Sequence, residues 1–259
     1  MLLDDQEEQQ LVEPYSKLAP IYDELMIHVD YKNWSRFIQK MIKRWHPNAK
    51  RILDISCGTA NLLLKLDSKK YQLYGLDYSF DMLKVARKKC KSSKSSIRFW
   101  QGNMISFSLK QPVDVIISLY DSVNYIMNAA AWQNMFNCVY DSLDINGLFI
   151  FDICTEKNSR DFFHNYYERK RGDGFYYTRE SKYDPENKIH SNRFEIYYDA
   201  EKKTFVEYHE QKILRMKQVL DMIEQTQFQF LGAFHGLTFK PGNENSLRIH
   251  FVLKKEANR

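Results

Sequence analysis

The chain has 259 residues, a length that suits one large α/β domain or such a domain with a sizeable insertion. A hydrophobic content of 44% and a charged content of 27% are typical of globular proteins, and the formal net charge of +5 is mild. No apolar stretch approaches the roughly 18–20 residues that a membrane-spanning helix needs, so the sequence excludes such a helix. The acidic, polar start, Met1 to Gln10, has the wrong chemistry for a signal peptide.

Cysteine usage agrees with a protein of the reducing cytoplasm. The four cysteines lie far apart and form no Cys-x-x-Cys pair, which argues against a metal site and against a disulfide framework. We therefore predict a cytoplasmic protein that holds no metal. Its free thiols, expected to be buried, are Cys57, Cys90, Cys138 and Cys154.

Up to about residue 153, segments with helical periodicity alternate with short apolar runs typical of strands. Helices are predicted near Asp4–Leu18 and over Tyr31–Trp45, Asn61–Leu66, Phe80–Cys90 and Ala130–Leu143. Strands are predicted over Arg51–Ile55, Gln72–Asp77, Ile97–Gln101, Val113–Leu119 and Leu148–Ile153. This alternation predicts a doubly wound α/β fold with a parallel sheet, whose ligand lies at the carboxyl ends of the strands.

Beyond residue 153, polar residues alternate with aromatic or β-branched ones in three segments that turn-like runs separate. These segments, Gly174–Tyr183, Ile189–Asp199 and Thr204–Leu214, predict an antiparallel meander. A helix and two strands then complete a seven-stranded, mostly parallel sheet: Met216–Gln225, Phe228–Phe234 and Leu247–Leu253. We therefore expect a core of residues 1–157 and 214–259, with residues 158–213 as an inserted antiparallel β lid.

The most informative run of the chain is Arg51 to Ala60, an apolar strand that ends in Asp54 and then breaks into small residues. A second apolar run ends in Asp77, which can accept hydrogen bonds from both hydroxyls of a ribose. Small residues at the turn let the backbone approach a ligand. This strand–turn–helix–strand layout predicts a nucleoside-binding site.

The residues of the turn indicate which nucleoside is bound. A dinucleotide site needs three glycines, and of the corresponding positions, Ser56, Gly58 and Asn61, only the middle one is a glycine. The carboxylate just before the turn, Asp54, suits a cationic ligand better than a phosphate. S-adenosylmethionine carries an ammonium and a sulfonium and no phosphate, so it fits this turn better than NAD does.

The run Asp54 to Ala60 resembles the first motif of the class I S-adenosylmethionine-dependent methyltransferases, Asp-x-x-Cys-Gly-Thr-Gly, with Ser56 and Ala60 in place of two glycines. The run Asp77 to Leu83 is similar to their Asp-x-Ser-x-x-Met-Leu. The resemblance implies that S-adenosylmethionine is the cofactor and S-adenosylhomocysteine the product. In these two runs it implies contacts to the cofactor from Asp54, Ser56, Cys57, Gly58, Asp77, Tyr78 and Met82.

The same resemblance assigns residues that follow the third and fourth strands. Asn103 and Met104 stand where the family commonly has Asp-Met, which implies that they contact the adenine. Leu119 ends the fourth strand beside the cofactor, and Asp121 and Tyr125 follow in the region that faces the transferred methyl group. Both are catalytic candidates. Asp121 either steadies the sulfonium, orients a substrate amine or only caps the next turn, and Tyr125 is expected to form a wall of the pocket.

The first thirty residues and the predicted lid are similar to those of sugar-amine and glycine N-methyltransferases. In those relatives an aromatic residue of the N-terminal segment folds over the cofactor, which implies this role for Tyr22 or Tyr15. Glu207 and His209 match an x-Glu-x-His pattern on a lid strand, where side chains two apart share a face. His209 is therefore a candidate base for a substrate nucleophile, with a purely structural histidine as the alternative.

The expected partner is a small-molecule methyl acceptor, in a protein that is a monomer or a homodimer and binds no membrane. An RNA methyltransferase is favoured only by basic residues between Lys84 and Arg98, which a solvated helix face also explains. A non-catalytic regulator that binds S-adenosylmethionine is the third hypothesis for the function, and a nicotinamide dehydrogenase is the least favoured one.

Overall fold

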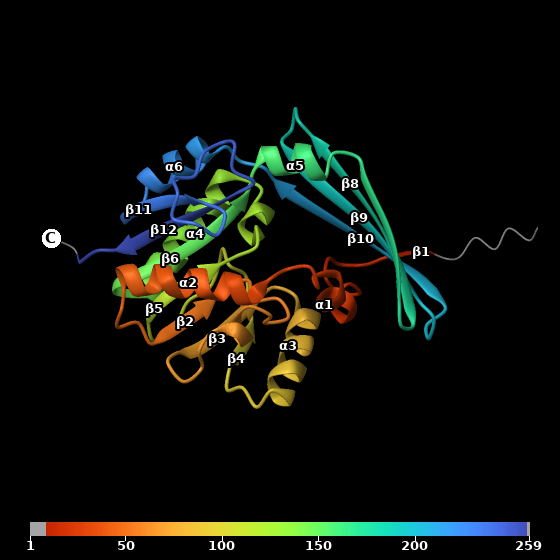
Figure 1. Cartoon of the computed structure of the whole chain (residues 1–259), viewed down its shortest axis with the longest axis horizontal. Helices are drawn as coiled ribbons and strands as arrows, with labels where there is room; N and C mark the ends of the chain where they lie inside the picture. The colour runs from red at the N-terminus through yellow and green to blue at the C-terminus, as the bar shows by residue number, and fades with distance from the viewer. Residues whose placement is uncertain (1–8, 258–259) are drawn as a thin grey trace, which may run out of the picture.

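The computed structural model describes residues 9–257, which fold into a larger sheet surrounded by helices and a second sheet beside it (Figure 1). The larger sheet has the spatial order β11-β12-β6-β5-β2-β3-β4. Its strands are β2 (Arg51–Asp54), β3 (Gln72–Asp77), β4 (Arg98–Gln101), β5 (Val113–Ser118), β6 (Leu143–Cys154), β11 (Phe228–His235) and β12 (Arg248–Lys255). Strands β2 to β6 are parallel, and β12 pairs antiparallel with both β6 and β11. This confirms the predicted doubly wound, mostly parallel sheet.

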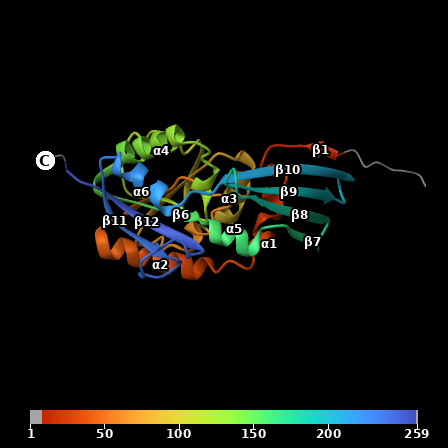
Figure 2. The same ribbon diagram turned by 90° about the horizontal axis from the view of Figure 1, so that it is seen from above.

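Helices cover both faces of the larger sheet, as Figure 2 shows from above. Apolar residues of α2 (Tyr31–Trp45) and α3 (Phe80–Ser92) pack on one face, where Ile52 and Ile150 lie at 0% exposure. Residues of α4 (Ala129–Ser142) and α6 (Met216–Glu224) pack on the other, against Phe149 and Phe151. Burial on both faces explains why these strands are almost continuously apolar.

The second sheet has the order β1-β10-β9-β8-β7. Its strands are β1 (Gln9–Leu11), β7 (Tyr166–Gly172), β8 (Phe175–Asp184), β9 (Ile189–Tyr198) and β10 (Lys203–Lys212). The three predicted strands of the meander are confirmed as β8, β9 and β10. The structure adds β7, the helix α5 (Glu156–Phe162) that leads to it, and β1, which pairs parallel with β10. Parallel pairing of β1 joins the start of the chain to a strand almost two hundred residues later.

The residues between β1 and α2 lie against one face of the second sheet. They include two short helices, η1 (Ala19–Ile21) and α1 (Tyr22–Leu25). Leu18 and Ile21 form an apolar cluster with Tyr177, Phe194 and Ile196 of the sheet. The N-terminal segment is thereby packed between the second sheet and the carboxyl ends of β2 and β3.

Two predicted helices are wrong. Of the predicted helix Asp4–Leu18, residues 4–8 lie outside the described part of the chain. Residues 9–11 are a strand, and Pro14 and the left-handed Tyr15, with φ +62°, prevent a helix beyond it. The predicted helix Asn61–Leu66 is a single 3-10 turn, Leu63–Lys65, because the left-handed Ala60, with φ +65°, precedes it and too few residues follow.

No helix in residues 9–257 is both long and apolar enough to cross a membrane. The four cysteines are free thiols, and all but Cys138 are buried. Assignment to the cytoplasm stays a prediction.

Candidate cofactor and acceptor site

Two carboxylates finish neighbouring strands at the point where the strand order reverses. Asp54 ends β2 and Asp77 ends β3, its parallel neighbour in the larger sheet. The Asp54 carboxylate accepts a hydrogen bond from the Ser56 backbone N–H at 3.0 Å. The Asp77 carboxylate accepts from the N–H groups of Gly58 at 2.7 Å and Ser79 at 2.9 Å. These bonds fix the loop that joins β2 to the next turn against the tip of β3.

Burial disfavours the ionised form of both carboxyl groups. The pKa of Asp54 is raised to about 7, mainly because the group is buried and further because Asp77 is near. The pKa of Asp77 is raised as well, again chiefly by burial. No basic side chain of the described residues forms an ion pair with either group. A ligand that brings a positive charge and hydroxyl donors fits this pair of carboxylates, whereas a phosphate does not.

The loop after β2 is shaped by a left-handed glycine and held from the N-terminal segment. Gly58 has φ +52°, a conformation that a side chain would strain. The Asp23 carboxylate accepts hydrogen bonds from Thr59 Oγ1 at 2.6 Å and Asn61 Nδ2 at 2.8 Å. It also pairs with Lys89 of α3 at 2.6 Å. Because Tyr22 is next in sequence to Asp23, these bonds set its ring beside the loop.

Two adjoining cavities open at this edge of the sheet, and both are lined by Tyr15, Tyr22, Ser56, Gly58, Ser122 and Tyr125. The larger, about 800 Å³, is also lined by Asp77, Tyr78, Met82, Asn103 and Met104. The smaller, about 270 Å³, is also lined by Asp54, Cys57, Leu119, Asp121 and His209. Every predicted site residue therefore lines one of the two cavities, and the larger is within the size range of small-molecule sites.

A strained turn follows β5 and carries the first predicted catalytic residue. Tyr120 and Asp121 are both left-handed, with φ +62° and +55°. Their backbone N–H groups donate to the carboxylate of Asp152, a residue of β6 that is fully buried, at 2.6 and 3.1 Å. Two consecutive left-handed residues cost about 1–2 kcal/mol each, so the turn exists because this carboxylate holds it.

Asp121 occupies the N-cap position of the turn Ser122–Tyr125, but its side chain makes no capping hydrogen bond there. Its carboxylate accepts from Arg248 Nη2 at 2.5 Å and from Gln211 Nε2 at 2.7 Å. Arg248, at the start of β12, also pairs with Asp152. The guanidinium of Arg248 lies 4.7 Å from the ring centre of Tyr120. Asp121 thus lines the smaller cavity and shares the charge of Arg248 with Asp152.

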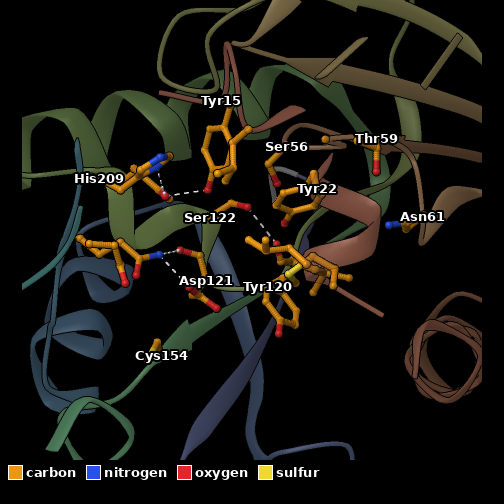
Figure 3. Close-up of a pocket in the computed structure, with 18 of the residues that line it drawn as sticks. Tyr15, Tyr22, Ser56, Thr59, Asn61, Tyr120, Asp121, Ser122, Cys154 and His209 are labelled. Atoms are coloured by element: carbon orange, nitrogen blue, oxygen red, sulfur yellow. Dashed lines mark hydrogen bonds between the residues drawn. The ribbon is translucent and has the colours of Figure 1, made fainter. Parts of the chain in front are cut away.

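The second sheet supplies a buried chain of hydrogen bonds to the other predicted catalytic residues (Figure 3). His209 Nε2 lies 3.1 Å from Glu207 Oε2, and His209 Nδ1 lies 3.0 Å from the hydroxyl of Tyr125. That hydroxyl lies 2.6 Å from the hydroxyl of Tyr15. His209 is 2% exposed and Glu207 fully buried. Their predicted placement on one face of the strand is confirmed.

Glu207 also fixes the N-terminal segment. Its carboxylate accepts from the backbone N–H groups of Tyr15, Lys17 and Leu18 at 2.6–2.8 Å. Because this carboxylate only accepts, the network assigns the His209 proton to Nε2 and leaves Nδ1 to accept from Tyr125.

Sequence reasoning missed several residues of the smaller cavity. The cavity is also lined by Arg248, Gln211 and Arg179. Asp152 holds the backbone of Tyr120, which lines it as well. Only Asp152 gave a signal, as a carboxylate inside the otherwise apolar run of residues 148–154. Of the basic residues between 84 and 98, Lys84 pairs with Asp81 and Lys89 with Asp23, so part of that charge is neutralised.

Comparisons with known proteins agree with this geometry. The methyltransferase domain family matches residues 52–147, from β2 into β6. A protein of Geobacillus sp. strain WCH70 that is named as a methyltransferase is 28% identical, over 93% of this chain and 99% of its own. The crystal structure of an S-adenosylmethionine-dependent methyltransferase from Clostridium acetobutylicum is 27% identical, has a TM-score of 0.81, and the match covers 94% and 99% of the two chains. The sugar N-methyltransferase KedS8 of a Streptoalloteichus species shares the fold at 17% identity, with a TM-score of 0.72 over 91% and 93%.

Proposed function

Because the chain belongs to the class I S-adenosylmethionine-dependent methyltransferases, we propose that it methylates a nitrogen or oxygen atom of a small-molecule acceptor. The observation that carries this proposal is the smaller cavity, which joins the nucleoside side of the site to a buried His209–Tyr125–Tyr15 chain. A buried histidine that a path of hydroxyls connects to the cavity can receive a proton from an acceptor bound there. This favours an enzyme over a regulator that only binds the cofactor.

In this proposal the larger cavity holds the adenosine and the smaller one the methionine end of the cofactor. Asp77 accepts from the ribose hydroxyls, and Tyr78, Asn103 and Met104 surround the adenine. Asp54 faces the positive charge of the ligand, which compensates for the burial that now raises its pKa. The remaining contacts come from Ser56, Cys57, Gly58, Met82, Leu119, Tyr15 and Tyr22.

When bound, S-adenosylmethionine would supply an electrophilic methyl group to the lone pair of the acceptor. The protein aligns the acceptor and excludes water. A proton that the acceptor loses moves through the hydroxyls of Tyr15 and Tyr125 to Nδ1 of His209. The Glu207 carboxylate stabilises the imidazolium that results.

The enclosure of the acceptor side supports a small molecule rather than RNA. Residues of α5, β8, β9 and β10 wall the smaller cavity, so residues 158–213 act as its lid in this proposal. Similarity in fold to a sugar N-methyltransferase supports an acceptor of this size. A polynucleotide would instead need an open, basic groove beside the methyl group.

Parallel calorimetric titrations with S-adenosylmethionine, S-adenosylhomocysteine and NAD test the cofactor side. We expect the first two to bind and NAD not to bind. Asp77→Ala should weaken S-adenosylhomocysteine binding by roughly 1–3 kcal/mol, because a carboxylate acceptor for the ribose hydroxyls is lost. The exposed Asp141→Ala is the matched control and should bind like the wild type. Binding of NAD alone would overturn the assignment.

The acceptor side is tested by measuring release of S-adenosylhomocysteine with two kinds of acceptor, a panel of small amines and alcohols and bulk tRNA. We expect turnover with members of the small-molecule panel. Turnover with tRNA and with no small molecule would show that the acceptor class is wrong while leaving the cofactor assignment intact.

A further inference from the structure

An arginine faces the smaller cavity without a carboxylate partner. Arg179 belongs to β8, in the row of alternate residues that includes the buried Tyr177 and Ser181. Its Nε donates to Asn192 Oδ1 of β9 at 2.9 Å. Within residues 9–257 no carboxylate oxygen lies within 4.0 Å of its guanidinium. Arg248, the other arginine of this cavity, is by contrast held by two carboxylates.

The carboxylate on the strand beside Arg179 forms no ion pair with it. Glu168 of β7 lies opposite Arg179 in the strand register. Its charge helps to raise the pKa values of Tyr166 and Tyr177. The guanidinium of Arg179 lies 5.0 Å from the ring centre of Phe163 and 5.5 Å from that of Phe194. Aromatic rings hold the group in place but do not neutralise it.

A second polar side chain of the same cavity, His190, has a buried nitrogen without a hydrogen-bond partner. His190 lines the same cavity at 3% exposure, and its Nε2 makes no hydrogen bond. Its other ring nitrogen lies 3.4 Å from Ser159 Oγ. Burial, with the charge of Arg179, lowers the pKa of His190 to about 4, so the ring is neutral at pH 7. An unpartnered ring nitrogen at such a depth points to a ligand that completes the site.

We propose that Arg179, with His190 in the same cavity, binds a carboxylate group of the methyl acceptor. This inference rests on the proposed function, because it places the acceptor in the same small cavity as Tyr125 and His209. The planar guanidinium presents parallel N–H donors that match the two oxygens of a carboxylate. The cavity of about 270 Å³ also holds the methionine end of the cofactor in the proposed arrangement, so the acceptor is then a small amino or hydroxy acid.

The position of Arg179 separates this role from binding of the cofactor's own carboxylate. Arg179 lies on the second sheet, where its charge acts on Tyr120 and Tyr125 of the methyl side. The loop after β2, which holds the methionine end in the proposed arrangement, interacts with Asp23 and Lys89 instead. In this proposal Arg179 therefore binds the acceptor and not the cofactor.

The test measures binding of matched carboxylates and carboxamides to the complex with S-adenosylhomocysteine, by calorimetry. The pairs are glycine and glycinamide, anthranilate and 2-aminobenzamide, and salicylate and salicylamide. We expect at least one carboxylate to bind the wild type tenfold or more tightly than its carboxamide. Arg179→Gln should abolish that preference. Arg179→Lys should keep part of it, because a lysine retains the charge but not the two parallel N–H donors of the guanidinium. Arg169→Gln, an exposed arginine on the neighbouring strand, should keep all of it.

The outcomes distinguish failure of this inference from failure of the proposed function. If S-adenosylhomocysteine does not bind the wild type, the proposed function fails and this inference with it. If it binds but no carboxylate is preferred, or if Arg179→Gln leaves the preference intact, only this inference is wrong. A tenfold loss of S-adenosylhomocysteine affinity in Arg179→Gln would also overturn it, since Arg179 would then hold the cofactor.

Discussion

Asp54 shows how a single buried residue is prepared for a cationic ligand. Removal from water raises its pKa to about 7, which destabilises the negative charge that the ligand needs. The strand tip nevertheless places it there with only a backbone N–H and a serine hydroxyl as partners. Binding of a positive charge restores the ionised form, so ligand affinity and ionisation of Asp54 are coupled.

This coupling predicts that S-adenosylhomocysteine binds about tenfold more weakly at pH 6 than at pH 8, measured by calorimetry. Only the ionised carboxylate attracts the ligand ammonium. With a pKa near 7, about a tenth of Asp54 is ionised at pH 6 and about nine-tenths at pH 8. The raised pKa of Asp77 acts in the same direction.

The isosteric Asp54→Asn variant is the control for the pH effect. It should bind more weakly at pH 8 than the wild type and should lose most of the dependence between pH 6 and pH 8. An equally steep dependence in this variant would mean that another group titrates.

The turn after β5 is an element whose conformation depends on a residue from another strand. Tyr120 and Asp121 are left-handed because Asp152 of β6 accepts both of their N–H groups and also pairs with Arg248. Asp152→Ala should therefore lower the free energy of unfolding by about 3–5 kcal/mol, since it removes a fully buried carboxylate that accepts both backbone N–H groups and pairs with the half-buried Arg248. Urea denaturation followed by circular dichroism measures the change.

Asp144→Asn is the matched control, because Asp144 also pairs with an arginine, Arg51, but is 41% exposed. An exposed ion pair contributes about 0–1 kcal/mol, so this variant should unfold close to the wild type. Equal destabilisation by the two substitutions would contradict the role given to Asp152.

Elements whose pattern is local were predictable, and elements that depend on distant partners were not. β3 and α2 have their predicted bounds, because an apolar run or an amphipathic stripe with a cap determines each of them locally. β1 pairs parallel with β10, about which its three exposed residues carry no information. The turn that replaces the predicted helix Asn61–Leu66 depends on a left-handed Ala60, which composition does not reveal.

The candidate site divides in the same way. Asp54, Gly58 and Asp77 form a spacing motif at two strand tips, so their meeting could be foreseen from the sequence. Arg248 and Arg179 reach the cavity from strands far along the chain, and their partners are set by the packing of two sheets. The charged groups of the smaller cavity could therefore be identified only from the structure, whereas the nucleoside-binding residues could be predicted from the sequence.

At the scale of the whole molecule, one buried carboxylate connects the two sheets and the N-terminal segment. Glu207 of the second sheet accepts N–H groups from residues 15, 17 and 18 and orients His209 toward Tyr125. Tyr15, held in this way in a left-handed conformation, lines both cavities. Glu207 therefore holds together the N-terminal segment, which covers the cofactor side, and the strand β10, which lines the acceptor side.

Glu207→Gln should loosen the N-terminal segment from the second sheet while leaving the larger sheet folded. The amide nitrogen that replaces one carboxylate oxygen donates, so it cannot accept from the backbone N–H groups that converge on this side chain. We expect hydrogen exchange at the amides of Tyr15, Lys17 and Leu18 to accelerate at least tenfold, with the amides of β2 and β3 unchanged. Glu210→Gln, an exposed change on the same strand, is the control and should leave all of these amides protected. Uniform acceleration across both sheets would mean that Glu207 stabilises the fold as a whole, and unchanged protection at residues 15–18 would mean that other contacts hold the segment.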